Sequence, residues 1–151
     1  MSSNRVFVVH GHDGEAKQAT ARFLERLGLE AIILHEQQDG SRTIIEKFEA
    51  HSDVGFAIIV HTADDVGNSK KAHDKDGSLN ARSRQNVVFE HGYFFGRLGR
   101  GRVVALVIGD IEIPSDLQGV IYTPMDDHDA WKTRVAKEMK AAGLSIDLNK
   151  L

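Results

Sequence analysis

The chain contains no cysteine, and this absence excludes disulfide bridges, thiolate zinc sites and cysteine nucleophiles. We therefore expect a reducing, cytoplasmic location. Long apolar runs are absent too. The run that begins at Val6 is much shorter than a secretory signal segment, and no run approaches the roughly 18 residues of a membrane-spanning helix. The sequence thus predicts a soluble domain without a membrane partner.

An excess of basic residues is also missing, because the formal net charge is -3. A chain with this charge has no general attraction for a phosphate backbone, so nucleic acid is not an expected partner. The 151 residues include only two prolines. A chain of this length is typical of one domain, which buries about two-thirds of the surface that its unfolded form exposes.

Short apolar runs alternate with helical patterns along the chain. The first run, at residues 6–9, is rich in β-branched residues, as is typical of a strand buried on both faces of a parallel sheet. The helical pattern that follows stops at Gly28, a usual helix end. The expected strands cover residues 6–9, 31–34, 56–60, 103–108 and 120–122, and the expected helices cover residues 15–27, 43–50, 86–98 and 129–142. The polar segment 62–83 is the longest expected loop.

This alternation predicts an α/β fold in which a five-stranded parallel sheet lies between two layers of helices, with the flavodoxin-like strand order 2-1-3-4-5. Such sheets bind ligands beyond the carboxyl ends of the strands where the order reverses, here after the first and third strands. The turn at residues 10–14 and the polar segment that begins at His61 and includes Asp65 occupy these positions. The predicted domain covers residues 1–143, and residues 144–151 are expected to be a surface tail or a connection to another domain.

The helix expected at residues 86–98 carries a carboxylate beside its apolar stripe. At about 100° per residue, one face of this helix must cover the sheet. The residues of that face are Val87, His91, Phe94, Phe95 and Leu98. Glu90 lies at the margin of the face, where partial desolvation requires a cation or a ligand nearby. It is either a surface glutamate paired with an arginine or a functional carboxylate, whereas His91 is interpreted as a hydrogen-bonded core residue.

Two segments carry a resemblance to a known family. The segment RQNVVFEHGYFFGRLGR, residues 84–100, and the segment VFVVHGHD, residues 6–13, resemble the prokaryotic TIR-like domain of bacterial anti-phage effectors. Such domains occur in TIR-STING proteins and in related cyclic-nucleotide-activated effectors of CBASS and Pycsar systems. The resemblance covers most of the chain and includes the segment at residues 114–119 and Trp131.

The resemblance implies an NAD hydrolase of the TIR class, in which the glutamate of an Asn-x-x-x-Glu helix is catalytic. Asn86 and Glu90 match this motif. NAD is then the substrate, and no cofactor is required. Nicotinamide leaves as a neutral base, so one carboxylate that stabilises the oxocarbenium-like charge is sufficient. The implied partners are further copies of the chain, whose assembly into oligomers or filaments activates the enzyme, and a cyclic-nucleotide sensor, such as a C-terminal STING-like domain or a separate chain.

Other candidate substrate contacts flank the expected crevice. Small residues in the first turn would let backbone N–H groups at a helix N-terminus meet a pyrophosphate, and a tight strand-to-helix connection is the alternative. This turn departs from the serine-containing box of eukaryotic TIR domains. The candidates are His10, Gly11, His12, Asp13, Asp65, Arg82, Arg84 and Asn86. No metal is expected, because His10 and His12 have no third ligand at a suitable spacing.

Two other functions fit the same residues. A non-catalytic TIR-like interaction module or nucleotide-binding scaffold would use Glu90 only structurally. A nucleoside deoxyribosyltransferase has a similar sheet and a glutamate nucleophile on a related helix, and it would be recognised by base exchange. Residues 67–78 are typical of mobile surface chain, and we hypothesise that they become ordered when subunits stack.

Overall fold

The computed structural model describes residues 3–33, 43–51, 53–114, 116 and 122–151. Within these residues, five strands form one parallel sheet in the order β2-β1-β3-β6-β7. The strands are β1 (Arg5–Val9), β2 (Glu30–Ile33), β3 (Ala57–His61), β6 (Val103–Val107) and β7 (Tyr122–Pro124). The predicted α/β class and the predicted order 2-1-3-4-5 are therefore confirmed. Parts of the expected second and fifth strands, at residues 34, 120 and 121, lie outside the described residues, as do residues 115 and 117–119 of the resembling segment.

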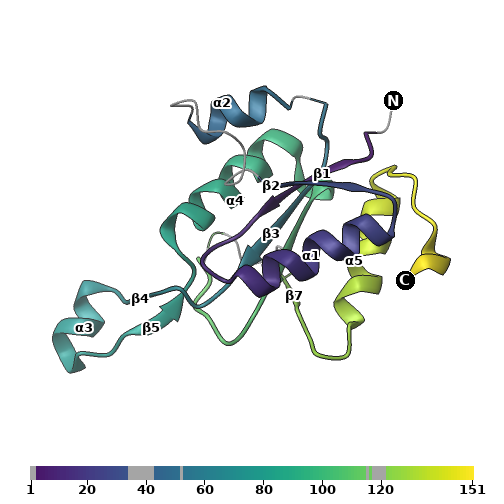
Figure 1. Cartoon of the computed structure of the whole chain (residues 1–151). Coiled ribbons are helices and arrows are strands. Elements are labelled where there is room, and N and C mark those ends of the chain that lie inside the picture. The colour runs from purple at the N-terminus through teal and green to yellow at the C-terminus, as the bar shows by residue number, and fades with distance from the viewer. Residues whose placement is uncertain (1–2, 34–42, 52, 115, 117–121) are drawn as a thin grey trace.

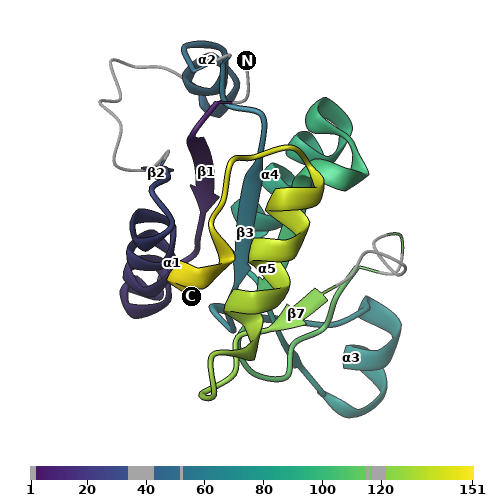
Figure 2. The same ribbon diagram turned by 90° about the vertical axis from the view of Figure 1, so that its right-hand side faces the viewer.

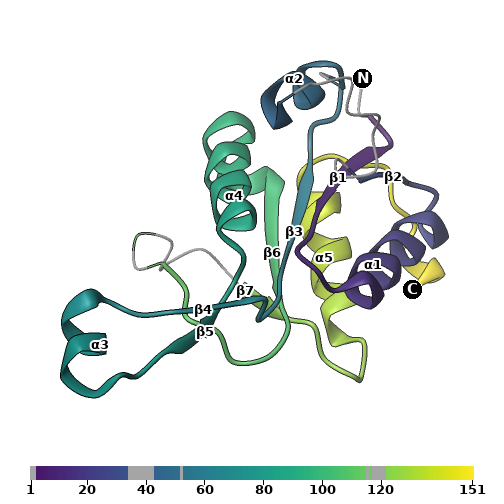
Figure 3. The same ribbon diagram turned by 60° about the vertical axis from the view of Figure 1, so that its left-hand side comes forward.

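Two layers of helices enclose the sheet (Figures 1 and 3). Helices α1 (Gly14–Arg26) and α5 (Ala130–Ala141) cover one face, whereas α2 (Ile44–Glu49) and α4 (Gln85–Leu98) cover the other. Figure 2 shows α5 lying along the sheet on the side of α1. The α2 helix begins with a capping box, in which Thr43 and Glu46 exchange side-chain and backbone hydrogen bonds. These four helices confirm the helices expected from the apolar spacing.

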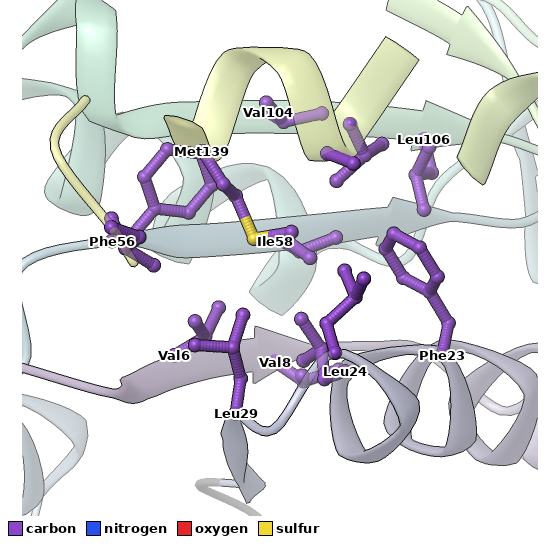
Figure 4. Packing of buried hydrophobic residues seen from close by; sticks show 14 of the residues in the cluster. Val6, Val8, Phe23, Leu24, Leu29, Phe56, Ile58, Val104, Leu106 and Met139 are labelled. Atoms are coloured by element: carbon purple, nitrogen blue, oxygen red, sulfur yellow. The ribbon is translucent and has the colours of Figure 1, made fainter. Parts of the chain in front are cut away.

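The core is divided by the sheet because successive side chains of a strand point to opposite faces. Val6, Val8 and Ile58 pack under α1 and α5, where Leu24 and Met139 cover them (Figure 4). A second cluster on the opposite face packs under α2 and α4; its members include Phe7, Val9, Phe48, Ile59, Val87 and Phe94. Fully burying such a side chain contributes about 1.5–3 kcal/mol to folding. The second cluster therefore packs α4 against one face of the sheet.

The prediction of a long polar loop at residues 62–83 is wrong, because this segment contains two strands and a helix. The strand β4 (Asp65–Gly67) pairs with β5 (Asn80–Arg82) in an antiparallel ladder, and α3 (Lys70–Asp76) connects them. This arm projects from the body of the domain (Figures 1 and 3). Ser69 caps α3 by accepting a hydrogen bond from Ala72 N, and Gly77 ends it in the left-handed conformation. No residue of α3 is buried, so the helix has no apolar period from which it could be predicted.

The segment after α5 returns to the core. Leu144 and Ile146 are buried with the α1 and α5 cluster, and a short 3₁₀ turn, η4 (Leu148–Lys150), follows. The first part of the segment 144–151 therefore packs as part of the domain, and its continuation into a further domain stays a prediction. Among the described residues, no helix combines the length and the apolar character needed to cross a membrane.

Candidate active site

The turn after β1 is tied to the end of β3 by a carboxylate. Asp64 Oδ2 accepts hydrogen bonds from His12 N at 3.1 Å and from Thr62 Oγ1 at 2.8 Å. A Cβ atom at Gly11 would overlap this carboxylate, so the close approach requires glycine at that position. The ends of two neighbouring parallel strands are thus held together at the edge where the predicted crevice lies.

Asp13 caps the helix that follows this turn. Its Oδ1 accepts a hydrogen bond from Ala16 N at 3.0 Å, which satisfies one of the free N–H groups at the start of α1. The N–H groups of His12 and Ala16 are therefore already bonded to carboxylates. This arrangement favours the tight strand-to-helix connection over a backbone cradle for a pyrophosphate. Contact of the side chains of His10 and His12 with a substrate stays a prediction.

Glu90 is buried in the helix layer, with only 4% of its surface exposed. The α4 helix, which carries it, packs against β1, β3 and β6. The alternative of a glutamate on the helix surface is therefore wrong. A carboxylate with so little contact with water is costly unless other groups interact with it, and in a region of low dielectric its field acts strongly on nearby charge.

The first turn of α4 differs from this buried position. Arg84 is the half-buried residue before the helix and makes no capping hydrogen bond with its side chain. Asn86 is exposed, although it lies one turn before Glu90 on the same arc. Sequence spacing places Asn86 and Glu90 together on one stripe, but in the structure Asn86 is exposed and Glu90 is buried.

Arg82 borders a hollow beside the start of α4. The hollow has a volume of about 310 Å³, and its lining consists of Arg82, Ser83, Gln85, Val88, Glu112 and Pro114. The guanidinium of Arg82 lies across Gly67, where a Cβ atom would overlap it. Asp65 is the residue opposite Arg82 in the β4–β5 ladder. These two predicted residues therefore belong to the base of the arm, and the remaining candidates lie at the β1 turn, at the N-cap of α4 or on α4.

His91, the residue after Glu90, belongs to a chain of buried polar groups whose connections no local motif of the sequence indicates. His61 Nδ1 lies 2.7 Å from Ser83 Oγ, and His61 Nε2 lies 3.0 Å from His91 Nδ1. Burial lowers the pKa of His61 to about 3, with a further contribution from His91, and burial lowers the pKa of His91 to about 4. Both rings are therefore neutral near pH 7. The interpretation of His91 as a hydrogen-bonded core residue is confirmed.

Metal-binding groups do not gather in the described part of the chain, where no cluster of three or more His, Asp or Glu side chains could hold an ion. His10 is half-buried and His12 is exposed.

Most of the chain matches a known protein family. The family model of the CAP12/Pycsar effector protein, TIR domain, matches residues 5–127. The chain belongs to this family. The resemblance to bacterial anti-phage TIR-like domains that was stated from the sequence is thereby confirmed, and the parallel sheet and its helices are those of a TIR-like domain.

Individual relatives of this TIR-domain chain come from bacteria and from an amoeba. The protein YuaY of Escherichia coli strain K12 is 54% identical over 149 residues, which are 98% of this chain and 48% of YuaY. Protein tirC of Dictyostelium discoideum is 36% identical over 125 residues, 78% of this chain and 62% of tirC. The Pycsar effector protein BcPycTIR of Burkholderia cepacia is 39% identical over 71 residues, 46% of this chain and 22% of that protein. This TIR-domain chain thus spans about half the length of YuaY.

Proposed function

We propose that the chain is the effector domain of an anti-phage system and that it hydrolyses NAD at the nicotinamide–ribosyl bond. The observation that carries this proposal is the burial of Glu90 on α4, a helix packed against β1 and β3. Parallel sheets of this order bind ligands beyond the ends of those two strands. Membership of the CAP12/Pycsar TIR family supports the anti-phage role.

One buried carboxylate suits this reaction. The ring nitrogen of nicotinamide is positively charged in NAD, so nicotinamide leaves as a neutral base and no side chain needs to protonate it. The ribose gains positive charge as the bond breaks. The negative charge of Glu90 stabilises that positive charge, and the effect is strong because the region excludes most water. The same carboxylate can accept hydrogen bonds from the ribose hydroxyls, and water completes the hydrolysis.

The charged side chains around the crevice favour one orientation of bound NAD. Asp13 and Asp64 place carboxylates at the β1 turn, which suits the cationic nicotinamide riboside end. Arg82 and Arg84 lie at the entry to α4, and guanidinium groups suit the pyrophosphate. We infer that the substrate lies with its phosphates toward the arginines.

Activation by association completes the proposal. One of the relatives is named as a Pycsar effector protein, and the chain spans only part of its relatives. We infer that a cyclic-nucleotide sensor elsewhere in a longer protein, or on a separate chain, brings copies of the domain together. The arm at residues 65–82 consists of two strands and a helix, and its further ordering when subunits stack stays a prediction.

The test is the release of nicotinamide from NAD over a range of protein concentrations. Glu90→Gln should lower the turnover number by about 100-fold or more, because a neutral amide does not stabilise the developing cation. Glu138→Gln is the matched control, since Glu138 is exposed on α5, on the opposite face of the sheet. Equal rates for the wild type and Glu90→Gln would reject the proposal in favour of a non-catalytic scaffold.

A second variant separates binding from chemistry. Arg84→Gln should raise KM more than it lowers kcat, because a phosphate contact is made in both the ground state and the transition state. Rising activity per molecule with protein concentration is the expected sign of association. If the rate per molecule did not change with protein concentration and the monomer were fully active, activation by association would be rejected. The proposed NAD hydrolysis would not be affected by that result.

A further inference from the structure

One imidazole ring is bonded both to α4 and to the segment that leads into that helix. Ser83, two residues before α4, bonds to Nδ1 of His61, and His91, in the second turn of α4, bonds to Nε2 of the same ring. All three side chains are buried, with 4%, 2% and 0% exposure for Ser83, His61 and His91. We call these three residues the histidine clamp.

His61 is itself fixed to the sheet. It is the last residue of β3 and pairs with Val107 of β6, and its carbonyl oxygen accepts a hydrogen bond from Ile108 N at 2.9 Å. The ring of Tyr122, in β7, lies 5.7 Å from the His61 ring and 6.0 Å from the His91 ring, measured between centroids. The clamp therefore connects α4 to the sheet through β3.

Apolar packing sets which face of α4 meets the sheet. Phe94 of α4 packs on Phe7 of β1 with ring centroids 5.3 Å apart, and aromatic pairs are accommodated over a range of separations and tilts. Hydrogen bonds do depend on direction. Two of them, at opposite edges of one rigid ring, restrict both the rotation of α4 about its axis and its position along that axis.

Glu90 is the neighbour of His91, so both side chains turn with the same helix. A rotation of about 20° displaces a side-chain end at the helix radius by about 2 Å, and a displacement of about 1 Å in a catalytic site can lower the rate by about 100-fold. The position of the Glu90 carboxylate is therefore sensitive to the clamp even though the clamp does not touch the substrate.

We propose that His61, His91 and Ser83 are positioning residues, which set the rotation of α4 and thereby aim the Glu90 carboxylate at the reacting ribose. This inference rests on the proposed function of Glu90. The clamp acts in its neutral form, in which each hydrogen bond has one donor and one acceptor. Its effect is on kcat, because correct aim is needed in the transition state.

A pair of variants at position 91 tests the proposal. His91→Asn keeps a polar atom at the place of Nδ1, whereas His91→Leu keeps most of the volume and loses the hydrogen bond. His91→Leu should lower kcat for nicotinamide release by about 10-fold to 100-fold with little change in KM. His91→Asn should stay within about threefold of the wild type. His73→Leu, on the exposed surface of α3, is the control and should change neither constant.

A second readout does not depend on activity. Amide hydrogen exchange in the first two turns of α4 should rise by about tenfold in His91→Leu and stay near the wild-type rate in His91→Asn. Wild-type chain that releases no nicotinamide would reject the proposed function, and the exchange rates would then decide whether the clamp fixes α4. Folded His91→Leu with wild-type kcat and wild-type exchange would overturn the clamp itself.

A third variant, Ser83→Ala, is included because it is less expected to disturb the fold than a change at position 91. Ser83→Ala removes one hydroxyl group and one of the two hydrogen bonds, and its thermal unfolding midpoint shows whether the fold survives. We expect a smaller loss of kcat than in His91→Leu, again without a rise in KM. Wild-type kcat in folded Ser83→Ala would show that the His61–His91 bond holds the helix alone and would overturn the two-point clamp.

Discussion

The carboxylate of Asp64 occupies the space that a side chain on Gly11 would fill. Asp64 in turn accepts hydrogen bonds from His12 N and Thr62 Oγ1, so the glycine, the carboxylate and the turn depend on one another. The ends of β1 and β3 are joined by this relationship at the side of the sheet where the proposed substrate binds.

Gly11→Ala should therefore destabilise the domain. The added methyl group must displace Asp64, which breaks two hydrogen bonds, and forced repacking of this kind costs about 1–3 kcal/mol. Chemical denaturation of both proteins measures the difference. Gly96→Ala is the control: Gly96 lies in α4 with open space around its Cβ position, so alanine there should be neutral or stabilising. Equal stabilities of Gly11→Ala and the wild type would contradict the close approach.

Asp13→Ala should lower stability by about 1 kcal/mol, because it removes the side-chain cap of α1. Asp13→Asn keeps an acceptor for Ala16 N and should recover most of that loss. Thermal unfolding of the three proteins gives the comparison. A loss of similar size in the asparagine variant would mean that the charge beside the helix N-terminus, and not the hydrogen bond, accounts for the effect.

The buried histidines predict sensitivity to acid. Their pKa values in the folded chain are about 3 for His61 and about 4 for His91, below the value near 6.5 of an unfolded histidine. Between these pH values the unfolded chain binds more protons than the folded chain. The two histidines therefore do not reduce the free energy of unfolding above about pH 6.5. As the pH drops toward 4, each of them lowers it by up to about 1.4 kcal/mol per pH unit.

Denaturation between pH 4.5 and 7 measures this dependence. His91→Asn removes one titrating ring, so the slope of stability against pH should decrease by about half of the part that the two histidines contribute, up to about 1.4 kcal/mol per pH unit. Carboxylates contribute equally to both proteins and cancel in the difference. An unchanged slope in the variant would mean that His91 is already protonated in the folded chain or is exposed to solvent.

Gly77→Ala should loosen the arm and leave the body of the domain intact. Gly77 has a φ of 70°, and alanine in this left-handed conformation costs about 1–2 kcal/mol. Since α3 buries no residue, the cost falls on the arm alone. Limited proteolysis should cut faster within residues 65–82, while the thermal midpoint stays within a few degrees of the wild type. A large drop in that midpoint would show that the arm supports the core.

The sequence by itself determined the sheet. The apolar runs at β1, β3 and β6 are buried on both faces, and their β-branched residues and intervening helical patterns specify a parallel order before any coordinate is known. It also identified Glu90 as a carboxylate beside an apolar stripe. These features depend on the chemical character and the spacing of residues that are close along the chain, which is what a sequence displays.

Only the tertiary structure decided how distant residues meet. Asp64 reaches Gly11 across 53 positions of the chain, and His61 reaches His91 across 30. Such pairs have no period or local motif, because the strand order alone brings them together. The arm was not predicted because α3 has no apolar face. Its ends are capped at Ser69 and Gly77, and it lacks the apolar pattern that indicates a buried helix. Hydrophobic periodicity encodes which face is buried, and it does not encode which polar atoms the fold makes neighbours.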